Sequence, residues 1–205
     1  MYNNQLERVP RGLPRRAKTL MLLHNGINEI GRNDLLRLLE TLDLSGNALH
    51  SLPLGLPRSL QVLRVKDNQL TSIPEGALQG MSKLGEIHLS HNQLKLNSIY
   101  QGAWMELSAL TTLDLSSNQL SHVPSDLPES LEYLYLQSNR ISTVPATAFE
   151  GTPNIKGIFL RSFKHLTNLR VLDIGHLSHS GPSGPPFGRE EEEEEEIEKV
   201  GEGFA

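Results

Sequence analysis

The chain has 205 residues, of which 37% are hydrophobic and 21% are charged, and it contains no cysteine. This composition is that of a globular protein, so it excludes a chain that is disordered throughout, and the lack of cysteine excludes disulfides and Cys-based zinc sites. The net charge of −5 is uneven, because the segment from residue 175 onward carries nine Glu against Arg189 and Lys199. The acidity therefore belongs to the C-terminal end.

The N-terminal residues begin abruptly. Met1 to Leu6 contain no basic segment followed by an apolar one, and no apolar run in the chain reaches the roughly 18 residues that span a bilayer. We therefore expect neither an export signal nor a membrane anchor in the chain as given. Asn4-Gln5-Leu6 already resembles the end of the repeat described next, which predicts a truncated N-terminal cap.

One pattern, L-x-x-L-x-L-x-x-N-x-L, recurs along the chain. Its Asn residues are 21 to 26 positions apart and are Asn4, Asn25, Asn47, Asn68, Asn92, Asn118 and Asn139. The alternating leucines of L-x-L predict a short strand with both leucines turned inward, and the Asn amide is expected to bond backbone groups of neighbouring turns as a ladder. Because no repeat can bury its leucines alone, the pattern predicts a leucine-rich-repeat solenoid of the α/β class.

The segments between the strands differ in length. Short repeats carry Leu13-Pro14, Leu56-Pro57 or Leu127-Pro128, and proline favours an extended, polyproline-like return path. Longer repeats, such as the one with residues 74–81, have room for a helical turn. We therefore expect a curved parallel sheet of seven strands on the concave face, and mixed polyproline, 3-10 and short helical structure on the convex face.

The repeat pattern ends before the chain does. After Asn154 the position of the ladder Asn holds Phe163, and the next repeat begins too early, so we interpret residues 161–163 as a broken repeat of a spliced or incomplete form. We expect the solenoid to occupy residues 1–174. Residues 175–205 form a Gly/Pro/Ser linker followed by Glu190 to Glu196, and seven adjacent like charges predict a disordered acidic tail.

These features together resemble the small leucine-rich proteoglycans. The resemblance rests on the alternation of 21-residue with 24- to 26-residue repeats, on the stretches 127–139 and 157–161, and on the acidic C-terminal run. It implies secretion, residence in the extracellular matrix, binding to collagen or another matrix protein, contact with cell-surface receptors or growth factors, and modulation of cell growth and migration. This chain departs from the family in lacking an N-terminal cysteine cluster.

Candidate binding residues are those that flank the strand leucines, since they point to the concave face. They are Arg64, His88, Asp114, Tyr133, Tyr135, Gln137, Phe159 and Arg161. Tyr133, Tyr135 and Phe159 predict an exposed aromatic patch, and aromatic residues with Arg are enriched at binding hot spots. The alternative is that these residues simply suit strands on a hydrated surface.

Two further groups could bind or carry polyanions. The basic residues Arg8, Arg11, Arg15, Arg16 and Lys18 could bind a sulfated glycosaminoglycan, or could be a solvated convex loop. Ser180 and Ser183 each precede a glycine and could be glycosaminoglycan attachment sites, or ordinary linker residues.

Other functional classes find little support in the sequence. His88-x-x-His91 lacks a third zinc ligand, so no metal or cofactor is expected. There is no nucleophile elbow, phosphate-binding glycine loop or carboxylate pair outside the tail, so no enzyme is expected, and neither nucleic-acid binding nor membrane insertion is predicted. The alternative to a matrix protein is an intracellular leucine-rich-repeat scaffold, which the lack of cysteine would suit and the longer repeats disfavour.

Overall fold

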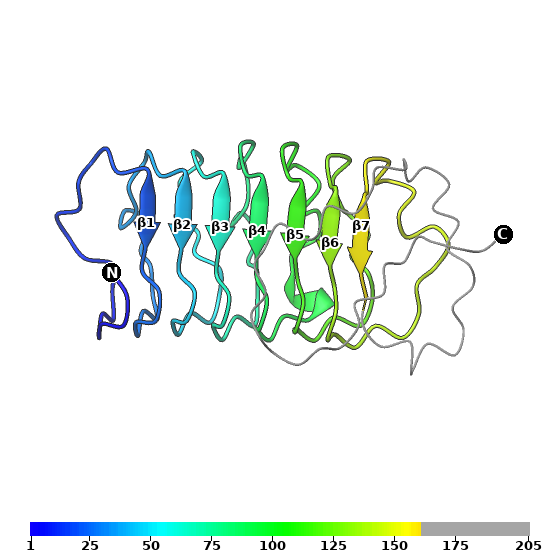
Figure 1. Ribbon diagram of the computed structural model, residues 1–205, viewed down its shortest axis with the longest axis horizontal. Helices are drawn as coiled ribbons and strands as arrows, with labels where there is room; N and C mark the ends of the chain where they lie inside the picture. The colour runs from blue at the N-terminus through cyan, green and yellow to red at the C-terminus, as the bar shows by residue number, and fades with distance from the viewer. Residues whose placement is uncertain (161–205) are drawn as a thin grey trace.

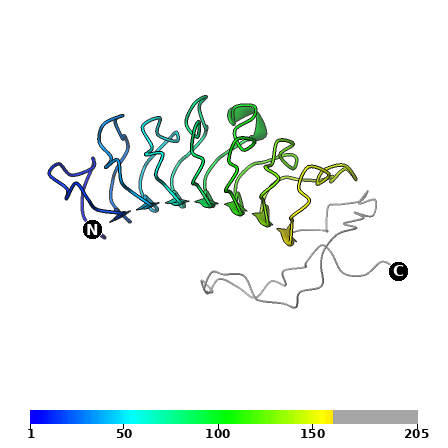
Figure 2. The same ribbon diagram turned by 90° about the horizontal axis from the view of Figure 1, so that it is seen from above.

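Seven short strands form one parallel sheet along the inner side of an arc in the computed structural model, which describes residues 1–160 (Figures 1 and 2). Their order in the sheet is their order in the chain. The strands are β1 (Thr19–Met21), β2 (Thr41–Asp43), β3 (Val62–Arg64), β4 (Glu86–His88), β5 (Thr112–Asp114), β6 (Tyr133–Tyr135) and β7 (Gly157–Phe159). The predicted concave parallel sheet is confirmed.

The register of the sheet follows the leucine pattern. The middle residues of the seven strands pair in one row, Leu20, Leu42, Leu63, Ile87, Leu113, Leu134 and Ile158, and all are buried. Each strand is centred on the first leucine of L-x-L and ends before the second, as Leu42 and Leu44 illustrate. Stacking the same position of every repeat produces one continuous apolar core.

The turn after each strand has the same geometry in successive repeats, and an asparagine side chain holds it. Asn47 Oδ1 accepts from the backbone N–H of Ile27 at 3.0 Å, and its Nδ2 donates to the carbonyls of Leu22 at 2.9 Å and Leu44 at 2.8 Å. Asn residues 25, 68, 92, 118 and 139 likewise accept from the preceding repeat. The predicted ladder is confirmed, and its first acceptor serves Leu6, so residues 4–6 do pack as the end of a repeat.

The residue before each ladder asparagine adopts a left-handed backbone conformation. Asp67 has φ 50°, His91 54° and Ser117 51°, whereas the second repeat uses Gly46 with φ 70°. A Cβ on Gly46 would collide with the imidazole of His24, so glycine leaves room for that side chain, while the backbone angle itself is adopted by Asp, His and Ser in other repeats.

The convex side is irregular. Its only helix among residues 1–160 is the 3-10 helix η1 (Leu96–Ser98), which lies in the 26-residue repeat. Residues 74–81, where the longer repeat has room for a helical turn, form consecutive turns, closed by Ala77 N–H to Pro74 O at 3.1 Å and Gln79 N–H to Gly76 O at 3.3 Å. Glycines at 76 and 80 with positive φ interrupt any helical run there.

Several predictions lie outside the described residues: the broken repeat at 161–163 with Phe163, the end of the solenoid at 174, and the acidic tail from 175 to 205. Within residues 1–160, the structure contains no helix with the length and apolar character needed to cross a membrane.

Candidate binding surface on the concave face

Strand pairing arranges the outward-facing side chains of the sheet in two parallel rows. The row at the start of the strands contains Thr19, Thr41, Val62, Glu86, Thr112, Tyr133 and Gly157, and the row at their end contains Met21, Asp43, Arg64, His88, Asp114, Tyr135 and Phe159. The sequence predicted both rows with this membership. Candidate residues that are up to 95 positions apart in the chain therefore lie on one surface.

The middle of this surface is charged and centred on His88. Its Nε2 lies 3.2 Å from Glu86 Oε2 on the same strand, and its Nδ1 lies 4.0 Å from Asp114 Oδ2 on the next strand. His88 was predicted to be a binding residue on the concave face, and its side chain is there but is only 4% exposed. Burial lowers the pKa of His88 below 6.5, although Glu86 and Asp114 both oppose that shift.

Two carboxylates on this surface accept hydrogen bonds from nearby backbone N–H groups. Asp43 Oδ1 accepts from Ser45 N–H at 2.9 Å, and Asp114 Oδ1 accepts from Ser116 N–H at 3.0 Å and from its hydroxyl at 2.7 Å. Asp43 is buried, whereas Asp114 and Arg64 are half-buried. In the row at the end of the strands, Arg64 and Asp114 are thus the charged side chains that a partner can reach.

Aromatic side chains gather at the C-terminal end of the described sheet. The rings of Tyr135 and Phe159 stack with their centroids 4.4 Å apart and their planes 5° apart. A Cβ on Gly157 would lie 3.0 Å from Tyr133 Cδ1 and 3.1 Å from Phe159 Cε2. The glycine thus leaves the space into which the two rings converge, and sequence reasoning missed its contribution.

The expectation that this aromatic patch is exposed was wrong for Tyr135. Tyr135 is only 8% exposed, since Phe159 covers one face of its ring, whereas Tyr133, Gln137 and Phe159 are half-buried. Burial raises the pKa of Tyr135 to about 12. Its hydroxyl is buried without a hydrogen-bond partner among the described residues, so Tyr133 and Phe159 are the rings available for binding.

The predicted basic cluster near the N-terminus is exposed and lies before β1, outside both strand rows, and acidic residues of the following repeats neutralise part of it. Arg8 Nη2 lies 3.4 Å from Glu29 Oε2, and Lys18 Nζ lies 2.9 Å from Glu40 Oε1. Arg11, Arg15 and Arg16, by contrast, have no ion pair within residues 1–160.

Arg161 and the serines Ser180 and Ser183 lie outside the described residues. In the part of the chain that the structure does describe, no group of three or more His, Asp or Glu side chains is placed to hold a metal ion.

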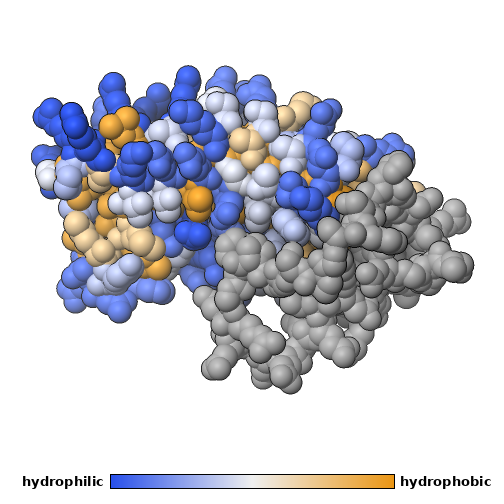
Figure 3. Space-filling model, turned by 45° about the horizontal axis from the view of Figure 1, so that its top comes forward, coloured by the Kyte–Doolittle hydropathy of each residue, from blue (hydrophilic) through white to orange (hydrophobic). Residues whose placement is uncertain are grey.

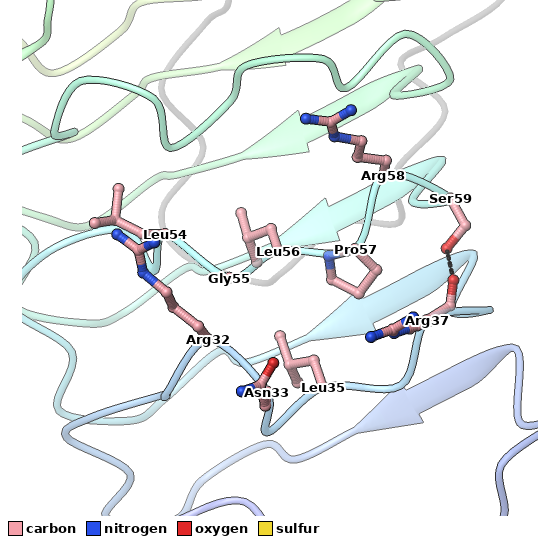
Figure 4. A pocket seen from close by; sticks show the side chains of 10 residues that line it. All are labelled: Arg32, Asn33, Leu35, Arg37, Leu54, Gly55, Leu56, Pro57, Arg58 and Ser59. Carbon is pink, nitrogen blue, oxygen red and sulfur yellow. Dashed lines mark hydrogen bonds between the residues drawn. The ribbon is translucent and has the colours of Figure 1, made fainter.

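A pocket of about 820 Å³ that was not predicted from the sequence lies on the convex side, between the segments that follow β1 and β2 (Figure 4). It is lined by Arg32, Asn33, Leu35, Arg37, Leu54, Gly55, Leu56, Pro57, Arg58 and Ser59. Gly55 allows the two repeats to approach here, because a Cβ on it would lie 2.5 Å from Arg32 Cα.

Comparison with known proteins agrees with this architecture. Family models described as Leucine rich repeat match residues 58–120, 38–58 and 130–151. A chain of the octameric complex of Latrophilin 3, Unc5D and FLRT2 has a similar structure, with a TM-score of 0.69 and 32% identity, over 81% of this chain and 56% of that one.

Named relatives are similar over most of the chain. Mouse podocan is 46% identical over 85% of this chain and 35% of its own length, and mouse podocan-like protein 1 is 43% identical over 87% and 37%. Rabbit fibromodulin is 40% identical over 61% of this chain and 82% of its own length. The chain thus spans only about a third of the length of podocan and podocan-like protein 1.

Proposed function

Because the chain belongs to the small leucine-rich proteoglycan family, we propose that it is a non-enzymatic extracellular matrix protein that binds collagen or another matrix protein through its concave face. Cell-surface receptors and growth factors are further partners within this proposal, through which the protein would modulate cell growth and migration.

The observation that carries the proposal is the aromatic cluster at one end of a charged surface. Tyr133 and Phe159 converge over Gly157, and Tyr135 supports Phe159 by stacking from the preceding strand. A ring held by its neighbours loses little freedom on binding, and aromatic residues are enriched among side chains that dominate interface energies.

The charges beside the cluster suit a polar partner. Arg64 on β3 and Asp114 on β5 carry opposite charges in the row at the end of the strands. The strand between them, β4, carries His88 in the same row and Glu86 in the other row. A ligand that carries both signs of charge along its length, as a collagen helix does, can match such a surface. Charge would mainly select and orient the partner, while the rings provide affinity.

Direct binding of the full chain to fibrillar collagen tests the proposal. We expect Tyr133→Ala to weaken binding about tenfold or more, as loss of a hot-spot residue does. Tyr133→Phe should bind almost as well as the parent, because it keeps the ring. Met105→Ala is a matched control, since Met105 is 65% exposed and outside both strand rows.

Circular dichroism must first show that each variant is folded. Equal binding by Tyr133→Ala and the parent would move the site away from the aromatic cluster. No binding by a folded parent to collagen or to extracted matrix proteins would overturn the matrix proposal and favour the intracellular scaffold.

A further inference from the structure

The same tight turn precedes each of the strands β1 to β4. A backbone N–H bonds the carbonyl three residues earlier, from Ala17 to Pro14 at 3.0 Å, Leu39 to Leu36 at 3.3 Å, Leu60 to Pro57 at 3.2 Å, and Leu84 to Met81 at 3.2 Å. The two central residues of these turns are Arg15-Arg16, Arg37-Leu38, Arg58-Ser59 and Ser82-Lys83. Each of the four turns therefore contributes at least one basic side chain, at the first central position in the first three turns and at the second central position in the fourth.

The row of basic residues ends at the fourth turn. The three later turns close in the same way, with Leu110 N–H to Leu107 O at 3.0 Å, Leu131 N–H to Pro128 O at 3.1 Å and Ile155 N–H to Thr152 O at 3.2 Å. Their central residues are Ser108-Ala109, Glu129-Ser130 and Pro153-Asn154. The basic row, Arg15, Arg16, Arg37, Arg58 and Lys83, is called the basic rim below.

All five side chains of the basic rim are exposed, and none has an ion pair within residues 1–160. The neighbouring Arg8 and Lys18, in contrast, are paired with Glu29 and Glu40. Figure 3, which brings the upper edge of Figure 1 forward, shows hydrophilic side chains along that edge over the N-terminal repeats. The rim is thus an uncompensated positive strip on the edge of the solenoid where the strands begin.

The rim is continuous with the pocket between the segments that follow β1 and β2, because Arg37 and Arg58 belong to both. Figure 4 shows the Arg37 side chain directed toward Leu35 inside the pocket, while Arg58 points toward the next repeat. There Arg58 Nε would lie 3.1 Å from a Cβ on Gly80, so its side chain crosses over that glycine. Arg32 adds a third guanidinium, and no acidic residue is among the side chains that line the pocket.

We propose that the basic rim and this pocket bind a sulfated polysaccharide chain that runs across the first four repeats. Neighbouring strands lie about 4.8 Å apart, so four stacked turns present cations along roughly 15 Å. A linear polymer with anionic groups along its length can follow such a row. Guanidinium groups form paired hydrogen bonds with tetrahedral oxyanions, and the pocket gives one sulfate a recess.

A nucleic acid fits the rim less well. Single-stranded nucleic acids are held by basic grooves in which aromatic side chains stack on the bases, and neither the rim nor the pocket lining contains an aromatic residue. The site also differs from the concave surface, since no residue of the rim is in either strand row.

Binding of the full chain to heparin tests the inference, with Arg37→Gln/Arg58→Gln as the variant. We expect its Kd to rise about tenfold, since two charge contacts are lost. Lys95→Gln/Arg140→Gln removes the same charge from exposed positions off the rim and should bind like the parent. Tyr133→Ala should also bind heparin normally, which separates this site from the collagen-binding proposal.

The specificity of the site provides a second readout. Desulfated heparin should bind at least tenfold more weakly than heparin, because sulfates are the groups that the guanidiniums recognise. Equal loss in both double variants would reduce the effect to net charge and overturn the site. Equal binding of poly-glutamate or single-stranded DNA would overturn the assignment to a sulfated polysaccharide.

Discussion

On the strand side of the solenoid the ladder residues from Asn25 to Asn139 make equivalent contacts, whereas the convex segments between the turns differ from repeat to repeat in length and in the side chains that they bury. Asn47 and Asn92 bond equivalent backbone groups in different repeats. The convex side of the 26-residue repeat instead contains η1, which has no counterpart in the other described repeats, and places the buried Trp104 where the repeat before it has Leu78 and a later one has Phe149. Repetition therefore stabilises one side, and individual large side chains stabilise the other.

The largest effect should come from the convex side. Trp104 is 1% exposed, so Trp104→Ala should lower the free energy of unfolding by about 3–5 kcal/mol, as truncation of a buried aromatic residue does. Urea denaturation measures this loss. Met105→Ala, at the neighbouring exposed position, should change stability by less than about 0.5 kcal/mol. Similar losses in the two variants would show that the convex side does not depend on Trp104.

Removal of one asparagine from the middle of the ladder should lower the free energy of unfolding somewhat less than Trp104→Ala does. Asn92→Ala leaves the Leu70 N–H and the Val65 and Leu89 carbonyls without their partner, and we expect a loss of about 3 kcal/mol. Asn25→Ala, at the half-buried N-terminal end, should lose about 1 kcal/mol because water can replace the amide there. Equal losses from thermal or urea unfolding would contradict a ladder whose strength depends on burial.

The smallest predicted effect is a pH dependence of stability, which comes from His88 in the repeat of β4. The pKa of His88 is lower in the fold than its value of 6.5 in the unfolded chain, so the unfolded chain takes up the proton first as pH falls. The stability that neutral His88 contributes is present above pH 6.5 and is lost as the pH falls below it. Between pH 7.5 and 5.5 the Tm of the parent should fall more than that of His88→Gln. Parallel Tm profiles would show that His88 stays neutral in both states or charges equally in both.

The strand side could be predicted from the sequence because its contacts depend on residue type at fixed positions. Leucine spacing identified the middle row of all seven strands, including Ile158, and asparagine marked each rung of the ladder. The extent of exposure could not be predicted, since it depends on neighbours from other repeats. Tyr135 is covered by Phe159, and the rings converge only because position 157 is glycine.

The convex side was less predictable, because repeats of different length have no common spacing there. The length of residues 74–81 left room for a helical turn without showing whether one forms; the segment folds as consecutive turns, while the 3-10 helix lies at residues 96–98. Of the basic rim, only Arg15 and Arg16 were predicted as polyanion-binding residues, and its continuation was missed. Arg37, Arg58 and Lys83 are related only through the turn that precedes the strand of each, which the structure reveals.

The asparagine ladder has a direction. Each side chain reaches back to the repeat before it, as Asn118 does when it accepts from Leu94 N–H and donates to the Leu89 carbonyl. A repeat therefore has its backbone groups satisfied only after the following repeat has been synthesised. During translation the newest repeat at the growing end is always incomplete, and the next one to emerge supplies the amide that fixes it. The asparagine hydrogen bonds of the ladder can therefore form only in the order in which the repeats are synthesised.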